Sequence, residues 1–256
     1  MSAGMERKLL LLSNDDGLEA KGLRCLIDIL RQDYDLLVVA PSGQRSAQSS
    51  CVTSGRPVSL RLVVDEKGLR EYACSGTPAD CVKLALSQKL TEGSIVGVVC
   101  GINHGSNAGM NALYSGTVGG AREGALHGLP AVALSLCNHD ANADFGRILA
   151  MAKTLVDRLI AGPNKRGVVW NINFPEPLQS KNVRMCRVGF NLWTNEFQKV
   201  EQISETEAVY ELGGDNINME PDEEQTDLWA IEHGYAAITP IGWDMTDYEH
   251  LKGEEE

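Results

Sequence analysis

No hydrophobic stretch in this sequence is long enough to cross a membrane. A membrane-spanning helix needs about 18 or more largely apolar residues, whereas the apolar run at 9–12 is only one turn long. The polar segment 1–8 before it lacks the layout of a secretory signal peptide. We therefore expect a soluble protein that has no membrane partner.

Positive charge is also scarce. The chain has 23 lysines and arginines against 35 aspartates and glutamates, which gives a formal net charge of −12. No stripe of basic residues offsets this charge, so double-stranded nucleic acid is disfavoured as a partner. An acidic chain can still bind a small phosphate ester if a bound cation supplies local positive charge.

The cysteines and histidines lack the spacings of structural metal or disulfide sites. There are seven cysteines, an odd number, and no C-x-x-C pair, so neither a disulfide framework nor a zinc ribbon is indicated. Several, such as Cys100 and Cys137, lie in apolar runs that are typical of reduced core thiols, and we expect a cytoplasmic protein. The five histidines show no H-x-x-x-H or H-x-H spacing, which argues against a histidine zinc site.

Three nucleotide and hydrolase fingerprints are missing as well. The sequence contains neither the dinucleotide-binding G-x-G-x-x-G after its first predicted strand nor a Walker P-loop, and it has no G-x-S-x-G elbow. A serine hydrolase mechanism therefore has no support. An NAD(P)-dependent oxidoreductase on a similar sheet is the alternative that we rank last.

What the sequence does contain is a regular alternation of strand and helix patterns. The apolar runs 8–13 and 35–40 flank a segment, 18–31, in which apolar residues recur at helical spacing, and this predicts a parallel β-α-β unit. The alternation predicts an α/β fold: a Rossmann-like, doubly wound, mostly parallel sheet. Further strands are predicted at 58–64 and 69–74 (a hairpin), 95–100, 131–136 and 167–172, and further helices at 77–90, 115–127 and 145–160.

The pattern changes after Pro175. Residues 183–211 contain short β-like runs, which predict a β-rich arm used in oligomer contacts, and a helix at 225–233 and a strand at 235–239 follow. We expect a catalytic core at 1–180 and a C-terminal extension at 181–256, or a single continuous domain over 1–256.

Three polar loops follow three of the predicted strands. They begin with Asn14-Asp15-Asp16-Gly17, with Pro41 and with Gly101. If the strands are neighbours, these loops open on one edge of the sheet, where ligands bind in such folds. Two adjacent aspartates repel each other, and a hard cation with oxygen ligands would relieve this repulsion. The alternative is a simple turn closed by the asparagine or aspartate side chains.

Two further segments could hold a phosphate. The glycine-rich loop 101–111 carries Asn103 and Asn107, and glycines let the backbone approach a ligand closely. Ser115-Gly116-Thr117 begins a predicted helix, whose free N–H groups and dipole favour anions. A plain flexible loop and an ordinary helix cap are the respective alternatives. His104 could donate a proton, or it could be a solvated loop histidine.

Several ordered blocks resemble the SurE family of survival-protein nucleotidases. They are SNDDG (13–17), VVAPSGQRS (38–46), SGTPADCV (75–82), GINHGSNAG (101–109) and YSGTVGGAREG (114–124), with VVWNINFP (168–175) and GYAAITPI (234–241) later in the chain. The resemblance implies a Rossmann-like core, a divalent metal, homodimers or homotetramers, and 5′/3′-nucleotidase activity on nucleoside monophosphates. Lys21 replaces a proline common in the family, and 191–225 matches the family poorly.

The resemblance also implies a ligand set. The matching positions give a metal site of Asp15, Asp16, Ser46 and Asn103, in which Ser46 rests on the resemblance alone. The cation would be Mg²⁺ or Mn²⁺. Our hypothesis is hydrolysis of a phosphomonoester, with Asp15 and Asp16 as the catalytic residues. The substrate phosphate would be held by the following residues: Asn14, Asn107, Ser115, Gly116 and Thr117.

Two questions about the chemistry stay open from sequence. Either water attacks phosphorus, which we favour, or one aspartate attacks and is then released by water. A non-catalytic nucleotide sensor that uses the same residues is the alternative function. The preferred base, the 5′ or 3′ position of the phosphate and the preferred metal are not indicated.

Overall fold

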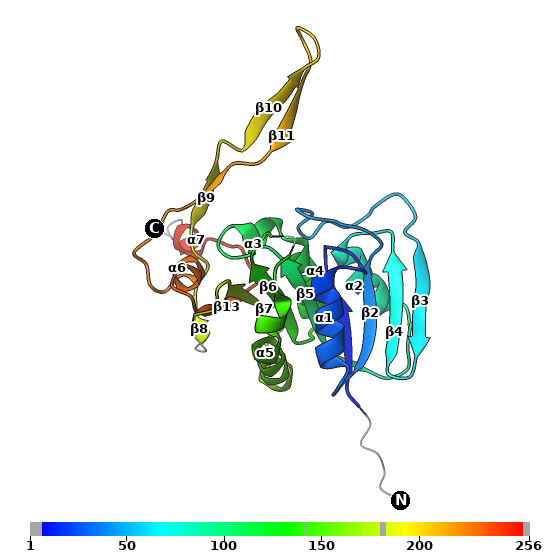
Figure 1. The fold of residues 1–256 in the computed structure, drawn as a ribbon. Coiled ribbons are helices and arrows are strands. Elements are labelled where there is room, and N and C mark those ends of the chain that lie inside the picture. Colours follow the sequence, from blue (N-terminus) through cyan, green and yellow to red (C-terminus); the bar gives the residue numbers. More distant parts are fainter. Residues whose placement is uncertain (1–6, 141, 180–182, 253–256) are drawn as a thin grey trace, which may run out of the picture.

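A nine-stranded sheet with helices on both faces forms the centre of the computed structural model (Figure 1). The structure describes residues 7–140, 142–179 and 183–252. The strands of this sheet are β1 (Leu9–Ser13), β2 (Asp35–Pro41), β3 (Leu60–Glu66), β4 (Leu69–Cys74), β5 (Ile95–His104), β6 (Ala131–Cys137), β7 (Val169–Pro175), β8 (Val183–Met185) and β13 (Ala236–Ile241).

The strand order is β3-β4-β2-β1-β5-β6-β7-β13-β8, and the run from β4 to β7 is parallel throughout. Strand β3 is antiparallel to β4, and β13 is antiparallel to β7. The predicted doubly wound, mostly parallel sheet is therefore confirmed. From β1 the chain first adds β2 and β4 on one side and later β5, β6 and β7 on the other, so the direction of winding changes between β1 and β5.

Helices cover both faces of the sheet and complete two apolar cores. Helices α1 (Lys21–Leu30) and α5 (Leu149–Ala161) contribute to one core, and α2 (Pro78–Ser87) and α4 (Gly116–Leu126) to the other. Helix α1 forms here because its apolar residues recur on one face and are buried. Helix α2 begins where predicted, since Thr77 and Asp80 form a capping box.

Some predicted boundaries were wrong. The strand expected to end at Cys100 continues to His104, because its last residues pair with β6 after a register irregularity between Cys100 and Asn103. Asn103 and His104 thus lie at the end of a strand rather than in a loop. The helix predicted over 145–160 is a short 3₁₀ turn, η1 (Phe145–Arg147), followed by α5, because the Asp144 carboxylate accepts a hydrogen bond from Gly146 N–H.

The C-terminal part both completes the sheet and leaves it. Strands β8 and β13 join the main sheet beside β7, while the hairpin of β10 (Phe197–Gln202) and β11 (Ala208–Leu212) projects away from the body (Figure 1). The β-rich arm expected after Pro175 is present. Its root is the pair β9 (Asn191–Thr194) and β12 (Asp215–Asn218); the remaining helices are α3 (Asn111–Tyr114), α6 (Asp227–Glu232) and α7 (Tyr248–Lys252).

The division at residue 180 stays a prediction, and residues 180–182 lie outside the described residues. None of the helices in the described ranges combines the length and apolar character that a membrane crossing requires.

The contact between α1 and β5 gives a stability prediction. Glycine-to-alanine changes inside helices normally stabilise by about 1 kcal/mol, but a β-carbon at Gly22 would collide with the carbonyl oxygen of Ile102. We expect Gly22→Ala to lower the free energy of unfolding by about 1–3 kcal/mol, as overpacked cores do. Urea unfolding would measure the change.

Gly43→Ala is the control, because among the described residues nothing lies within 4 Å of a β-carbon at Gly43. A Gly22→Ala protein at least as stable as the wild type would show that α1 can move off β5 at no cost.

Candidate functional site

The three polar loops meet where the winding direction of the sheet changes. Because β2, β1 and β5 are adjacent, the segments after their carboxyl ends share one edge of the sheet. Two backbone groups show how closely they approach: Arg45 N–H donates to the Asp15 carbonyl oxygen at 2.6 Å, and His104 N–H donates to Oδ2 of Asp16 at 3.1 Å. The predicted convergence is confirmed.

Asp15 links the end of β1 to the start of α4. Its side chain is only 4% exposed, and its Oδ1 accepts a hydrogen bond from the Thr117 hydroxyl. A β-carbon at Gly116 would lie 2.8 Å from the β-carbon of Asp15, closer than two such atoms can pack. Glycine is therefore required at the first residue of α4 for the helix to come this close to the carboxylate.

The charges of Asp15 and Asp16 are poorly compensated by the protein. Burial raises the pKa of Asp15 to about 6, the neighbouring Asp16 charge raises it further, and the hydrogen bond from Thr117 opposes the shift. Burial also raises the pKa of Asp16 above its usual range, although the His104 N–H works against it. Two adjacent carboxyl groups that resist ionisation form a site that a bound cation would stabilise.

The remaining donor atoms suit a hard cation. Asn103 donates its Nδ2 to the Gly105 carbonyl at 2.8 Å, which leaves Oδ1 as a possible ligand. Ser46 is exposed and its Oγ accepts a hydrogen bond from Gln44. Within the described ranges no cluster of three or more histidine, cysteine, aspartate or glutamate side chains could hold a metal. Any cation here would thus use carboxylate, amide and hydroxyl oxygens, the ligands that Mg²⁺ and Mn²⁺ accept.

The start of α4 presents polar hydrogens beside these oxygens. The Ser115 hydroxyl oxygen caps the helix by accepting from Val118 N–H at 3.1 Å, whereas N–H groups in a first helical turn have no carbonyl partner within the helix. Asn107 is 7% exposed and donates one hydrogen of its Nδ2 to the Ser135 hydroxyl at 2.9 Å. The second hydrogen of that amide and the N–H groups of Gly116 and Thr117 are the donors available to an anion.

Two candidate side chains are engaged elsewhere. The Asn14 amide closes its own turn, donating to the Gly17 carbonyl at 2.9 Å and accepting from Gly17 N–H at 3.3 Å. The His104 ring lies against Phe145, and its Nε2 is 2.6 Å from the Asp140 carbonyl oxygen. Thus His104 meets Asp16 through its backbone rather than its ring, and the substrate role of Asn14 stays a prediction.

The sequence reading missed the residues that support the loop after β5. Asn171 and Asn173 on β7 bond the backbone of Asn107, Asp227 accepts from Gly109 N–H, and Asn191 accepts from Met110 N–H. The one available signal was the alternation of asparagine with apolar residues in WNINF (170–174). Asparagine is unfavourable in a buried strand, so its presence at alternate positions calls for a specific role.

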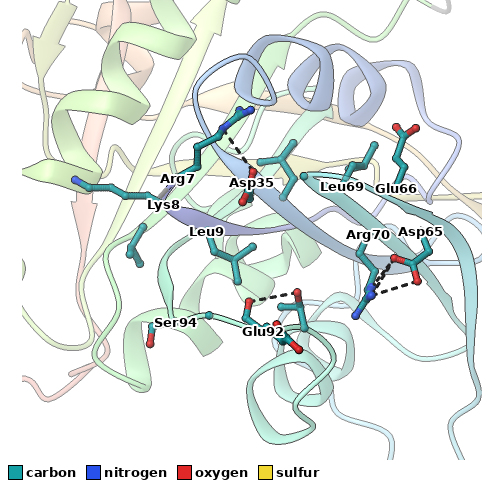
Figure 2. Close-up of a pocket in the computed structure, with 15 residues that line it drawn as sticks. Arg7, Lys8, Leu9, Asp35, Asp65, Glu66, Leu69, Arg70, Glu92 and Ser94 are labelled. Atoms are coloured by element: carbon teal, nitrogen blue, oxygen red, sulfur yellow. Dashed lines mark hydrogen bonds and ion pairs between the residues drawn. The ribbon is translucent and has the colours of Figure 1, made fainter. Parts of the chain in front are cut away.

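Two cavities lie on the molecule, and only one is near this edge. The cavity in Figure 2, of about 610 Å³, lies at the opposite edge, where β1, β2 and β4 begin; its charged side chains include the ion pairs Arg7–Asp35 and Arg70–Asp65. A second cavity of about 590 Å³ is lined by Arg45 and Thr77, among others. Because the backbone of Arg45 bonds Asp15, this second cavity adjoins the candidate site and offers room for the rest of a ligand.

Comparisons with known proteins agree on one family. The family model for survival protein SurE matches residues 10–195. The chain is 43% identical to the 5′-nucleotidase SurE of Phocaeicola vulgatus, covering 95% of this chain and 94% of that protein. It is 37% identical to the 5′-nucleotidase SurE of Caldanaerobacter subterraneus subsp. tengcongensis, with coverages of 97% and 96%. The crystal structure of the SurE protein from Aquifex aeolicus superposes with a TM-score of 0.79 at 30% identity, over 96% of this chain and 97% of that chain.

The raised pKa of Asp15 predicts a pH-dependent instability in the absence of metal. Between its ordinary pKa of 3.8 and about 6, the folded protein holds a proton that the unfolded chain has lost. Stability therefore falls as pH rises through this window, by about 2–3 kcal/mol at roughly 1.4 kcal/mol per pKa unit. Asp15→Asn cannot ionise and keeps an acceptor for Thr117. In EDTA we expect it to be about 2 kcal/mol more stable than the wild type at pH 7.5 and similar to it at pH 4.

Urea unfolding at the two pH values would measure this difference. Asp28→Asn, on the exposed face of α1, should follow the wild type at both. A wild type that keeps its stability across the window would mean that the protein itself compensates the Asp15 charge.

Proposed function

This chain belongs to the SurE family of survival proteins, and we propose that it is a metal-dependent phosphomonoesterase that hydrolyses nucleoside monophosphates to nucleoside and phosphate. Its relatives are named 5′-nucleotidases. The observation that carries the proposal is the contact of Asp15 with Thr117. This contact joins oxygen ligands for a cation to the start of a helix that favours anions, so metal and phosphate would bind side by side.

We assign the metal to Asp15, Asp16, Ser46 and Asn103, all of which offer oxygen atoms. When bound, Mg²⁺ or Mn²⁺ would offset the charge of the phosphate oxygens and of the two carboxylates. Thr117 would hold Asp15 in one orientation through its hydroxyl group. The preferred metal is left to experiment.

On the other side of the phosphate, the N–H groups of Gly116 and Thr117 and the amide of Asn107 would bind its free oxygens. These donors are fixed by the fold before substrate arrives, so they cost little reorganisation when charge moves onto the oxygens in the transition state. Ser115 contributes by capping α4, which keeps the first turn regular.

Hydrolysis needs a base for the attacking water. Asp16 is only half-buried, and its raised pKa makes it a better proton acceptor than an ordinary aspartate. Water oxygen would attack phosphorus, the bond to the nucleoside oxygen would break, and that oxygen would leave with a proton. Direct attack by an aspartate is the other route; it requires an acyl phosphate, which rapid quenching would trap.

A nucleotide sensor without catalysis is the alternative use of the same residues. A sensor needs donors for phosphate but gains nothing from a second carboxylate beside the first, which repels an anion. The pair Asp15–Asp16 therefore favours the enzyme.

We also propose a cytoplasmic homodimer or homotetramer. The cytoplasmic location rests on the free thiols of the seven cysteines. The assembly rests on the arm, where Phe197 and Leu212 face each other in register and are 66% and 62% exposed. Large apolar side chains on a projecting hairpin suit contact with another copy of the chain.

The activity has a direct test. We expect phosphate release from AMP, GMP, UMP or an aryl phosphate to require Mg²⁺ or Mn²⁺ and to stop in EDTA. Asp16→Asn should lower kcat/KM at least about 100-fold, because it removes both a metal ligand and the base. Asp28→Asn makes the same change of charge on α1 and should leave the rate unchanged. If wild type and Asp16→Asn bind nucleotide but release no phosphate with any metal, the sensor would be the better description.

The oligomer has a separate test. Replacing both Phe197 and Leu212 with serine should shift the protein toward a monomer in light scattering, because the arm loses apolar area that association would bury. Leu251→Ser, at another exposed leucine, should leave the mass unchanged. A double variant with the wild-type mass would place the interface elsewhere.

A further inference from the structure

Strand β7 carries two buried asparagines on one face. Asn171 and Asn173 are fully buried, and they alternate with Ile172 and Phe174, which belong to the apolar core on the other face of the sheet. Strand β7 lies inside the sheet, between β6 and β13. Side chains two residues apart in a strand point the same way, so the two amides face the same neighbour.

That neighbour is a single peptide segment of the active-site loop. Asn173 accepts a hydrogen bond from the backbone N–H of Asn107 at 2.9 Å. Asn171 donates its Nδ2 to the backbone carbonyl of Asn107 at 2.8 Å. Because an N–H can only donate and a carbonyl can only accept, these backbone groups also fix which way each amide is turned.

A row of polar side chains crosses the sheet at the same level. Asn103 on β5 is paired in register with Ser135 on β6, and Ser135 with Asn173 on β7. Ser135 in turn accepts a hydrogen bond from the Asn107 side chain. Asn107 is thus held by its N–H, its carbonyl and its side chain, next to the residue assigned to the metal.

These asparagines do not serve stability well. Within the described residues, Oδ1 of Asn171 and Nδ2 of Asn173 are buried without a hydrogen-bond partner. Leaving polar atoms unpaired in a protein interior costs folding free energy. Apolar side chains would suit a central strand better, so the two amides need a different explanation.

We propose that Asn171 and Asn173 are positioning residues that orient Asn107 for the reaction. The pair clamps the Asn107 peptide so that the side-chain amide of Asn107 faces the phosphate edge rather than moving with the glycine-rich loop. This inference rests on the proposed function, in which Asn107 binds a phosphate oxygen.

The other supports of the loop act at a different place. Asp227 and Asn191 accept from the N–H groups of Gly109 and Met110. They hold the part of the loop that leads into α3, whereas only the β7 pair bonds the backbone of Asn107 among the contacts of the described residues. Loss of the pair should therefore release Asn107 while the rest of the loop stays attached.

Leucine variants at the two positions test the proposal. Asn171→Leu and Asn173→Leu keep the approximate size of the side chain and remove the bonds to Asn107. We expect each to lower kcat/KM for AMP by about 10- to 100-fold, as small misplacements of reacting groups do. Asn173→Asp keeps an acceptor oxygen for the Asn107 N–H and should recover most of the rate lost in Asn173→Leu.

Ile172→Ala is the matched control for damage to the strand. It lies between the two asparagines and opens a cavity in the opposite core, so it should lower the melting temperature while kcat/KM stays within about twofold of wild type. If Ile172→Ala loses as much activity as the leucine variants, or if these keep wild-type rates, the positioning role is wrong.

A second readout separates this inference from the proposed function. Hydrogen exchange of the Asn107 amide should quicken in Asn173→Leu and stay slow in Ile172→Ala, and it requires no activity. Wild-type protein without phosphatase activity would refute the proposed function alone. An Asn107 amide that stays protected in Asn173→Leu would refute the clamp, whatever the enzyme does.

Discussion

The burial of two adjacent carboxylates at the end of β1 is the constraint on which the candidate site depends. Asp15 and Asp16 follow a strand with no exposed residue, and their raised pKa values reflect the missing solvent. The surrounding groups partly answer this cost: the Thr117 hydroxyl donates to Asp15, and the His104 N–H donates to Asp16. Neutral donors do not cancel two charges in a poorly solvated place, and this deficit is what gives the site its preference for a cation.

The fold places this deficit where other loops can share it. The winding of the sheet reverses between β1 and β5, and a crevice opens at such a point because the flanking connections leave in opposite directions. Helix α4 can approach Asp15 only because Gly116 has no side chain. The anion-binding and cation-binding halves of the site therefore depend on each other, since neither would be in place without the contact at Gly116 and Thr117.

The parts that follow from local pattern could be read from the sequence. The buried runs that became β1 and β2, the helix between them and the capping box of α2 all depend on neighbouring residues. The meeting of the polar loops followed from strand order. What could not be read depends on pairing between distant strands. The extension of β5 to His104 requires β6 as a partner, and the antiparallel entry of β13 beside β7 has no local signature.

The same limit applies to the site. Asp15, Asp16 and Thr117 announced themselves as polar residues after a strand or at a helix start. Ser46 lies in a serine-rich loop where only resemblance could select it. Asn171 and Asn173 act through a loop more than sixty positions away in sequence, so their role became visible only when the sheet brought the two together.

The root of the arm connects the C-terminal part to the active-site loop. Asn191, the first residue of β9, accepts from Met110 N–H and donates to the side chain of Asn216 in β12. Asp227 bonds the N–H groups of both Gly109 and Gly189. The pairing of β9 with β12 therefore supports the site, whereas the hairpin of β10 and β11 lies beyond it. Because these are separate stretches of the same arm, the contacts that hold the loop do not depend on what the tip of the arm binds.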